Sequence, residues 1–309
     1  MSHPIRCNRT GVLQLHSAIL IVATAILIGV LALGGHKAFS LGRATVTDSE
    51  RFRLSLREIE ITPRPVWIRA DLLGQVQRSA GLPDELSSLD VQLTSRLGEA
   101  FGANPWVRKV REVRLIHPRT VRVGLTYREP VAVVQTAHSL HPIDRDAVLL
   151  PAEDLSDPAI YVTISGVRST PTGPAGTKWQ DPVVQAAAIT ADTLAGYHLK
   201  LSISAIDVTE YRPAATRPGA IMLLTEAGTR VKWGRPPEDD FPGEVSTQTK
   251  LTRLFKYIQD HGSLDKPAGP NDIDITHLEE ISVRPRAAAD RPSRQPAPAP
   301  ITPAERRQG

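Results

Sequence analysis

The most uniform stretch of the chain is an apolar run near its N-terminus, Val12 to Gly35, which contains no Asp, Glu, Lys or Arg. About 20 apolar residues in a helix are enough to cross a hydrocarbon core of about 30 Å. A helix satisfies its own backbone groups inside lipid, so the pattern predicts one transmembrane helix over 12–35. A cleaved signal peptide is the alternative, but its apolar region is typically about 7–15 residues, and this run is longer.

After a polar connector over 36–53, the apolar positions predict a unit with the order strand, helix, helix, strand, strand. The first strand falls within 54–63, and apolar residues at helical spacing up to Gly81 predict the first helix. The second helix is marked by an apolar stripe of Leu89, Leu93, Leu97 and Phe101. Two alternating runs around the turn at 117–120 predict a strand pair. This order is typical of an α+β fold whose helices cover one sheet face.

The second half of the body, 131–283, predicts a larger mixed β domain. Asp181 and Pro182 form the cap and first turn of one helix, and the spacing from Leu251 to Ile258 predicts a second, amphipathic helix. Two short extended runs close this domain, with the apolar residues Ile273, Ile275, Ile281 and Val283. The tail over 284–309 is rich in Pro, Ala and Arg, a composition that predicts disorder.

The formal net charge of +4 does not indicate a nucleic-acid-binding face. Of the 37 basic and 33 acidic residues, six arginines and two acids lie from Arg284 onward, which leaves 31 of each in the rest of the chain. A basic tail on a balanced body differs from the clustered positive surface of nucleic-acid-binding proteins. The single cysteine, Cys7, excludes an intramolecular disulfide and a cysteine-based zinc site.

The sequence contains no recognisable catalytic constellation. No Gly-x-Ser-x-Gly motif is present to hold a nucleophilic serine on a sharp turn. The densest metal-like group consists of His138, His141, Asp144 and Asp146. A metal needs three or four converging ligands, but an extended chain directs His138 and His141 to opposite faces. Trp106, directly after Asn104-Pro105, is expected to fill the core. We therefore expect no enzymatic activity, no cofactor and no metal site.

The segment from Asn104 to Val134, NPWVRKVREVRLIHPRTVRVGLTYREPVAVV, resembles the POTRA domain of the FtsQ/DivIB family of bacterial cell division proteins. The motifs that carry the resemblance are Pro105-Trp106-Val107, Pro118-Arg119-Thr120 and Glu129-Pro130-Val131-Ala132. The Arg-Glu-Pro step resembles the hinge that leads from this domain to the family's second β domain. The resemblance covers the anchor and roughly 54–283, and it departs at Ala147, where Gly is usual, and in the loop 235–249.

The resemblance implies a membrane-anchored scaffold that links divisome proteins at the septum and regulates septal peptidoglycan synthesis. Its partners would be FtsB-like (DivIC-like) and FtsL-like single-pass division proteins, and it would reside in the inner membrane with its body on the periplasmic side. The implied organisation is a cytoplasmic N-terminus 1–11, a transmembrane helix 12–35, a connector 36–53, a POTRA domain 54–130, an FtsQ-type β domain 131–283 and a tail 284–309.

An exposed strand edge can bind a partner strand through backbone hydrogen bonds, a mode called β-augmentation. An edge with unpaired N–H and C=O groups is a liability unless something covers it. We hypothesise that Asp272 to Val283 forms such an edge, because this segment is extended, apolar and last in the body. An ordinary interior strand is the alternative. The resemblance favours the edge, with Ile273, Ile275, Ile281 and Val283 on or near the partner strand.

The charges that flank the apolar run conflict with the family's membrane orientation. Arg6 and Arg9 precede the run, whereas five basic residues follow it between Lys37 and Arg57. The positive-inside rule would therefore keep the body in the cytoplasm, while the resemblance favours an exported body. Two other function classes stay open: a POTRA-bearing assembly or transport factor for envelope proteins, and a membrane-anchored enzyme with its site in the second domain.

Overall fold

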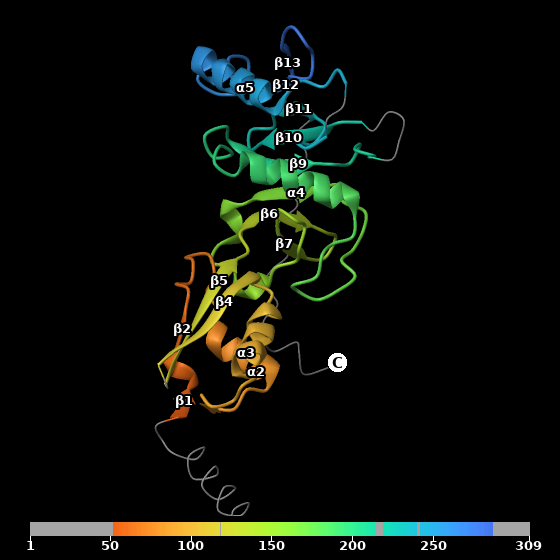
Figure 1. Cartoon of the computed structure of the whole chain (residues 1–309). Coiled ribbons are helices and arrows are strands. Elements are labelled where there is room, and N and C mark those ends of the chain that lie inside the picture. The colour runs from red at the N-terminus through yellow and green to blue at the C-terminus, as the bar shows by residue number, and fades with distance from the viewer. Residues whose placement is uncertain (1–51, 118, 214–218, 240–241, 287–309) are drawn as a thin grey trace, which may run out of the picture. The chain divides into compact units, whose positions relative to one another are not determined.

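A computed structural model describes residues 52–117, 119–213, 219–239 and 242–286 (Figure 1). The predicted transmembrane helix and the tail beyond Arg286 lie outside the described residues. Within the described part of the chain, no helix combines the length and the apolar character needed to cross a bilayer. The described residues form a mixed α+β fold with four α-helices, which agrees with the predicted fold class.

The first part of the body contains the predicted order of strand, helix, helix, strand and strand. The corresponding elements are β2 (Ile59–Ile61), α2 (Leu72–Ala80), α3 (Leu93–Gly102), β4 (Val107–His117) and β5 (Thr120–Tyr127). The three strands form one sheet in the order β2-β5-β4. A pair that was not predicted, β1 (Arg53–Ser55) and β3 (Glu85–Ser87), forms a separate two-stranded sheet.

The start of the second helix differs from the prediction. Leu89 was expected in the buried stripe of the second helix, but its side chain is 42% exposed and α3 begins only at Leu93. The cause is Asp90, whose carboxylate accepts a hydrogen bond from Gln92 N at 2.9 Å. Such a local bond competes with helical geometry and favours a helix start after it. The other three residues of the predicted stripe are buried as expected, at 0–3% exposure: Leu93, Leu97 and Phe101.

The rest of the body is built on one eight-stranded sheet. Its strands are β6 (Pro130–Gln135), β7 (Leu140–Asp144), β8 (Val162–Ser165), β9 (Ile203–Asp207), β10 (Ile221–Thr225), β11 (Arg230–Gly234), β12 (Asn271–Asp274) and β13 (Ser282–Pro285). They follow the order β13-β12-β11-β10-β9-β8-β6-β7. Parallel neighbours need a crossover. The crossover from β8 to β9 contains α4 (Pro182–Leu194), and that from β11 to β12 contains α5 (Thr247–His261).

Both long helices begin at a side-chain cap, and the cap of α4 is the one that the sequence predicts. Asp181 accepts a hydrogen bond from Val183 N at 2.8 Å and so caps α4. Ser246 accepts one from Thr249 N at 3.2 Å and caps α5, which ends at Gly262 in the left-handed conformation. These caps fix where each helix starts over the sheet, and therefore which side chains of α5 reach the edge formed by β12 and β13.

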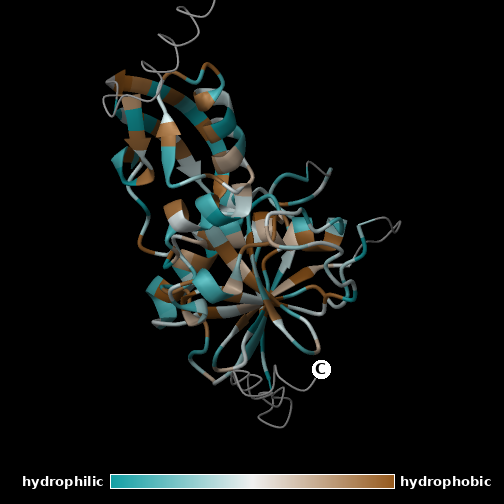
Figure 2. Cartoon of the chain, turned by 90° about the horizontal axis from the view of Figure 1, so that it is seen from below, coloured by the Kyte–Doolittle hydropathy of each residue, from teal (hydrophilic) through white to brown (hydrophobic). Residues whose placement is uncertain are grey.

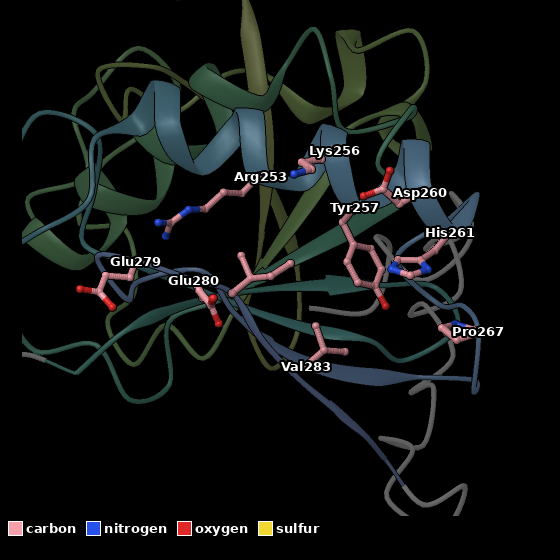
Figure 3. A pocket seen from close by; sticks show the side chains of 10 residues that line it. Arg253, Lys256, Tyr257, Asp260, His261, Pro267, Glu279, Glu280 and Val283 are labelled. Carbon is pink, nitrogen blue, oxygen red and sulfur yellow. The ribbon is translucent and has the colours of Figure 1, made fainter.

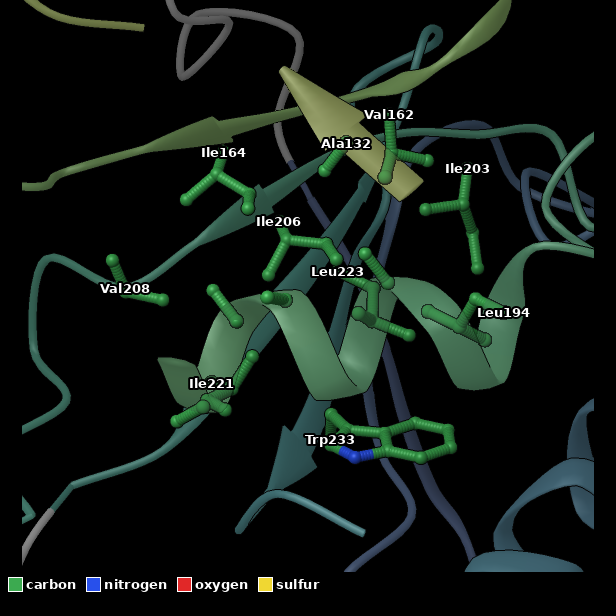
Figure 4. Packing of buried hydrophobic residues seen from close by; sticks show 14 of the residues in the cluster. Ala132, Val162, Ile164, Leu194, Ile203, Ile206, Val208, Ile221, Leu223 and Trp233 are labelled. Atoms are coloured by element: carbon green, nitrogen blue, oxygen red, sulfur yellow. The ribbon is translucent and has the colours of Figure 1, made fainter. Parts of the chain in front are cut away.

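The core of the eight-stranded sheet lies on the face that α4 and α5 cover. Side chains of β6, β8, β9 and β10 point toward α4, among them Ala132, Ile164, Ile206 and Leu223, which are all 0% exposed (Figure 4). Their neighbours in sequence point to the other face, and hydrophobic and hydrophilic residues accordingly alternate along several strands (Figure 2). One face is thus a buried core, and the other is only partly covered.

The chain divides into two compact units. The first consists of Met1–Glu60, Pro83–Leu97 and Val113–Arg122, and the second of Ile61–Leu82, Gly98–Glu112 and Val123–Gly309. The predicted domain boundaries at 130 and 283 stay predictions. The whole eight-stranded sheet and the predicted partner-binding residues belong to the second unit.

The Arg-Glu-Pro step is firmly tied within the second unit. Arg128 N donates to Trp106 O at 2.8 Å, and Trp67 Nε1 donates to Arg128 O at 3.1 Å. The Arg128 guanidinium also forms an ion pair with Asp144 at 2.7 Å, and both side chains are largely buried. Trp106 is completely buried, which confirms the expectation that it fills the core. Its indole Nε1 donates to Asp154 at 3.3 Å.

Candidate strand-pairing edge

Some of the predicted partner-binding residues are buried in the core, and others lie at the edge of the sheet. Ile273 in β12 and Ile275 just after it are 2% and 1% exposed and belong to the core, so their side chains are not available to a partner. Ile281 is partly buried against that core. Val283 in β13 is 36% exposed. The segment that was predicted as one edge therefore forms two strands, because the chain turns back between Asp274 and Ser282.

Among the described strands, β13 is the open end of the sheet. β12 pairs in parallel with β11 and antiparallel with β13, so it is an interior strand. β7 ends the sheet on the other side, but its outer edge is already occupied. Leu150 N donates to Pro142 O at 2.8 Å, and Asp144 N donates to Val148 O at 3.1 Å. The segment after β7 thus covers that edge, whereas β13 pairs only with β12.

The backbone of β13 directs few hydrogen-bonding groups outward. Arg286 N donates to Pro270 O at 2.8 Å, and Arg284 lies opposite Asp272 in the antiparallel register. Since inward-facing and outward-facing residues alternate along an antiparallel edge, Val283 directs its N–H and C=O away from β12. Pro285 also faces outward, but it has no N–H to donate. The free edge is therefore short, and Val283 supplies its central donor and acceptor.

A groove of about 610 Å³ lies between α5 and this edge (Figure 3). Val283 and Ile281 line it from the strand side, and Tyr257 points into it from α5. The other lining residues are Arg253, Lys256, Asp260, His261, Pro267, Glu279 and Glu280. The wall is mixed, with apolar contacts near β13 and charges of both signs farther out. A strand added to β13 would direct every second side chain toward this groove.

Arg253 holds the connection between β12 and β13 in place. Its guanidinium donates to the carbonyl oxygens of Ile275 at 2.9 Å, His277 at 2.5 Å and Leu278 at 2.9 Å. A guanidinium has five N–H donors in a fixed plane, so it can bind several carbonyls of one loop at once. Farther along α5, Tyr257 Oη donates to Lys266 O at 2.7 Å. The helix therefore orders both loops that border the edge.

Behind the edge, the partly covered face of the sheet carries charges of alternating sign. Lys232 in β11 forms an ion pair with Asp274 in β12 at 2.9 Å, and Arg286 approaches Asp272 to 3.6 Å. Burial alone would raise the pKa of the Asp274 carboxyl, but hydrogen bonds from Thr276 and Lys232 outweigh this effect and hold the pKa below its usual value. Asp274 is therefore a stable anion in the middle of this face.

One buried cation lies at the start of α5. Lys250 is 2% exposed, and its ammonium group donates to the Glu244 carboxylate and lies 5.1 Å from the centre of the Trp233 ring. Burial lowers the pKa of Lys250, and the hydrogen bond to Glu244 offsets part of that shift. A buried lysine can act as a nucleophile when its amine is accessible. Here the Glu244 carboxylate and the Trp233 indole enclose the amine of Lys250. We therefore interpret this pair as a part of the core that stabilises the fold.

The residues of the metal-like group are drawn into separate interactions. Asp144 binds Arg128, and Asp146 forms an ion pair with Arg108 at 2.7 Å. His141 Nε2 lies 2.7 Å from Ser139 Oγ, and burial lowers the pKa of this histidine. Across the described residues, no three side chains of His, Cys, Asp or Glu are grouped in a way that could hold a metal ion.

Comparisons with known proteins do not add to this picture. No protein-family model matches the chain, and no curated protein matches it either.

Sequence reasoning missed the residues that shape the edge: Arg253, Tyr257, Arg284 and Pro285. Arg253 and Tyr257 are four residues apart and so lie on one side of α5, where Tyr257 is 5% exposed and belongs to the core. That spacing was the available signal. The roles of Arg284 and Pro285 depend on strand register, which no local pattern in the sequence specifies.

Proposed function

We propose that this chain is a membrane-anchored cell division scaffold of the FtsQ/DivIB type, which binds a partner strand at the outer edge of β13. The observation that carries the proposal is the edge around Val283, which pairs outward with none of the described residues and lies beside a groove, at the end of a sheet whose opposite edge is covered. The order of elements from β2 to β5 and the motifs between Asn104 and Val134 support the family resemblance.

In this function the chain is not an enzyme. Its work is to hold FtsB-like and FtsL-like single-pass proteins at the division septum and so to regulate septal peptidoglycan synthesis. Backbone hydrogen bonds from the outward groups of β13 would supply much of the affinity, and side chains that enter the groove would supply specificity. The body would lie on the periplasmic side of the inner membrane, with the apolar run 12–35 as its anchor.

The test is co-purification in detergent of the tagged full chain with FtsB-like and FtsL-like proteins expressed beside it. Val283→Pro removes the central outward donor without removing a bond to β12, so it should abolish strand addition while the body stays folded. Val283→Ala is the matched control, since it shortens the side chain and keeps the N–H. A proline at Ile275 would be less informative, because that residue is 1% exposed and its replacement would disturb the core.

The expected result is co-elution with the wild type and with Val283→Ala, and loss of the partner with Val283→Pro. Thermal unfolding of each variant would verify that the body is intact. If neither division protein co-elutes with the wild type, the scaffold proposal fails. If the partner binds Val283→Pro as well as the wild type, the edge of β13 is not the binding site.

A further inference from the structure

The last three strands of the large sheet carry opposite charges in adjacent rows on the partly covered face. Arg230 and Lys232 of β11 lie opposite Asp272 and Asp274 of β12 in the parallel register. Asp272 in turn lies opposite Arg284 of β13. Residues directly opposite in paired strands have neighbouring side chains on the same face. The rows are therefore basic on β11, acidic on β12 and basic on β13.

We call these alternating rows of charge on β11, β12 and β13 the charge ladder. Its outermost cation, Arg284, is available to bind a partner. Arg284 is exposed, and its side chain forms no hydrogen bond or ion pair with the residues that the structure describes. The acid opposite it, Asp272, has an ion pair of its own with Arg286 at 3.6 Å. Lys232 and Asp274 satisfy each other one step farther in. The alternation thus ends at β13, the outermost described strand, with an exposed arginine.

We propose that the strand added to β13 carries an acidic residue next to Arg284 and apolar residues on either side of it. This inference rests on the proposed strand addition and specifies its partner. An acidic residue would continue the ladder by one row, since opposite charges in adjacent strands stabilise a pair. The residues before and after it would point to the other face, toward the groove that Val283, Ile281 and Tyr257 line.

The same charges disfavour a second copy of this chain as the occupant. Pairing two β13 strands edge to edge would bring Arg284 and Arg286 of both chains together along a four-residue strand. Like charges in adjacent strands destabilise the pair, and charged residues on edges are a common device against self-association. The edge is thus built to select a strand of opposite charge.

The experiment measures binding of two dye-labelled peptides to the full chain in detergent micelles by fluorescence anisotropy. One peptide alternates glutamate with valine over eight residues, and the other alternates lysine with valine. The wild type should bind the glutamate peptide about fivefold more tightly, which corresponds to roughly one favourable cross-strand charge pair. In Arg284→Glu the preference should reverse. High salt should reduce the preference in both proteins, because exposed charges are screened.

Arg168→Glu is the matched control. It makes the same change in net charge at an exposed residue just after β8, which is separated from β13 by four strands of the sheet. It should keep the preference of the wild type. Val283→Pro should weaken both peptides equally, because it removes a backbone donor and leaves the charges unchanged.

Equal binding of the two peptides by the wild type, or a preference that Arg284→Glu leaves unchanged, would overturn the charge ladder. Absence of binding by either peptide would overturn it as well. Association of the wild type with itself in sedimentation measurements, lost in Val283→Pro, would show that a second copy is the occupant. These results can be distinguished from failure of the scaffold proposal. That proposal fails when the division proteins do not co-elute with the wild type, whatever the peptides do.

Discussion

Ile273 and Val283 lie directly opposite each other in the antiparallel pair of β12 and β13, yet Ile273 is 2% exposed and Val283 is 36% exposed. The two side chains share one face of the sheet, and α5 covers the first but not the second completely. This pair marks the line at which the hydrophobic core ends and the groove begins. It also separates residues that stabilise the fold from residues that can bind a partner.

The first prediction concerns stability at this line. Ile273→Ala leaves a cavity in the core and should lower the free energy of unfolding by about 2–4 kcal/mol. Val283→Ala removes a partly exposed side chain and should change it by less than about 0.5 kcal/mol. Urea unfolding followed by circular dichroism would measure both. Equal losses would mean that β13 is as deeply packed as β12 and that the groove is closed in solution.

The buried pair of Lys250 and Glu244 leads to a second prediction. Glu244→Gln leaves the ammonium group buried without a counter-charge and should destabilise the protein by about 3 kcal/mol. Lys250→Met should cost less, because the Glu244 carboxylate is 18% exposed and also accepts a hydrogen bond from Arg235 N at 3.2 Å. The double variant should recover part of the loss in Glu244→Gln. Purely additive effects of the two substitutions would contradict a direct interaction.

Lys250 also predicts a pH dependence with a defined sign. Its folded pKa is lowered by burial from the ordinary value of 10.5, so the unfolded chain binds the extra proton. The free energy of unfolding should therefore rise as the pH increases from the folded pKa toward 10.5. The rise should be absent in Lys250→Met. Measurements of urea unfolding across the alkaline range would test this, and an unchanged slope in the variant would rule it out.

Much of the local structure could be predicted because it depends on neighbouring residues. The cap at Asp181, the end of α2 at Gly81 and the buried face of α5 each follow from a few positions in sequence. Leu89 shows the limit of this approach. It continues the apolar stripe of α3 at the expected spacing, but the hydrogen bond from Gln92 N to Asp90 starts the helix after it. A single side-chain bond outweighed the periodicity.

The edge could be predicted only in part, because strand order is not a local property. Extended apolar runs near the end of the body indicated strands, but whether Ile273 or Val283 lies outermost depends on which strand pairs with β11. The parallel pairing of β11 and β12 is made possible by the crossover through α5, which places β12 inside and leaves the last strand at the edge. The outward direction of Pro285 follows only from that register.

A fourth prediction comes from Ala147, which stands where the family that the sequence resembles usually has glycine. Ala147 has a φ of 57°, a left-handed conformation that glycine adopts at little cost and other residues adopt under strain. It is also fully buried, so a glycine would lose contacts of the methyl group while it relieves strain. Ala147→Gly should therefore change the free energy of unfolding by less than about 1 kcal/mol.

The matched variant at this position is Ala147→Val. A β-branched side chain is disfavoured in the left-handed region and would also overpack the site, so we expect a loss of about 2 kcal/mol or more. Urea unfolding of the two variants side by side would measure the difference. A valine that is tolerated as well as glycine would show that the turn does not keep this conformation in solution.

The last prediction concerns Asp274 at the centre of the charge ladder. Its folded pKa lies below the ordinary value of 3.8, because hydrogen bonds from Thr276 and Lys232 outweigh the effect of burial. A carboxyl with a lowered pKa contributes stability above its unfolded pKa and loses it as the pH falls through the folded pKa. Unfolding measured from about pH 5 down to pH 2 should show this loss in the wild type and not in Asp274→Asn.

The contributions of two neighbours of Asp274, Lys232 and His277, to this loss of stability can be measured separately. Lys232→Met removes one hydrogen-bond donor to this carboxylate, so it should reduce the size of the loss without abolishing it, because the bonds from Thr276 remain. His277 Nε2 lies 3.5 Å from the same carboxylate, and the His277 side chain is mostly exposed. His277→Gln tests whether this contact contributes to the loss. If the acid loss persists unchanged in Asp274→Asn, other carboxylates carry it and the anion at the centre of the ladder does not stabilise the edge.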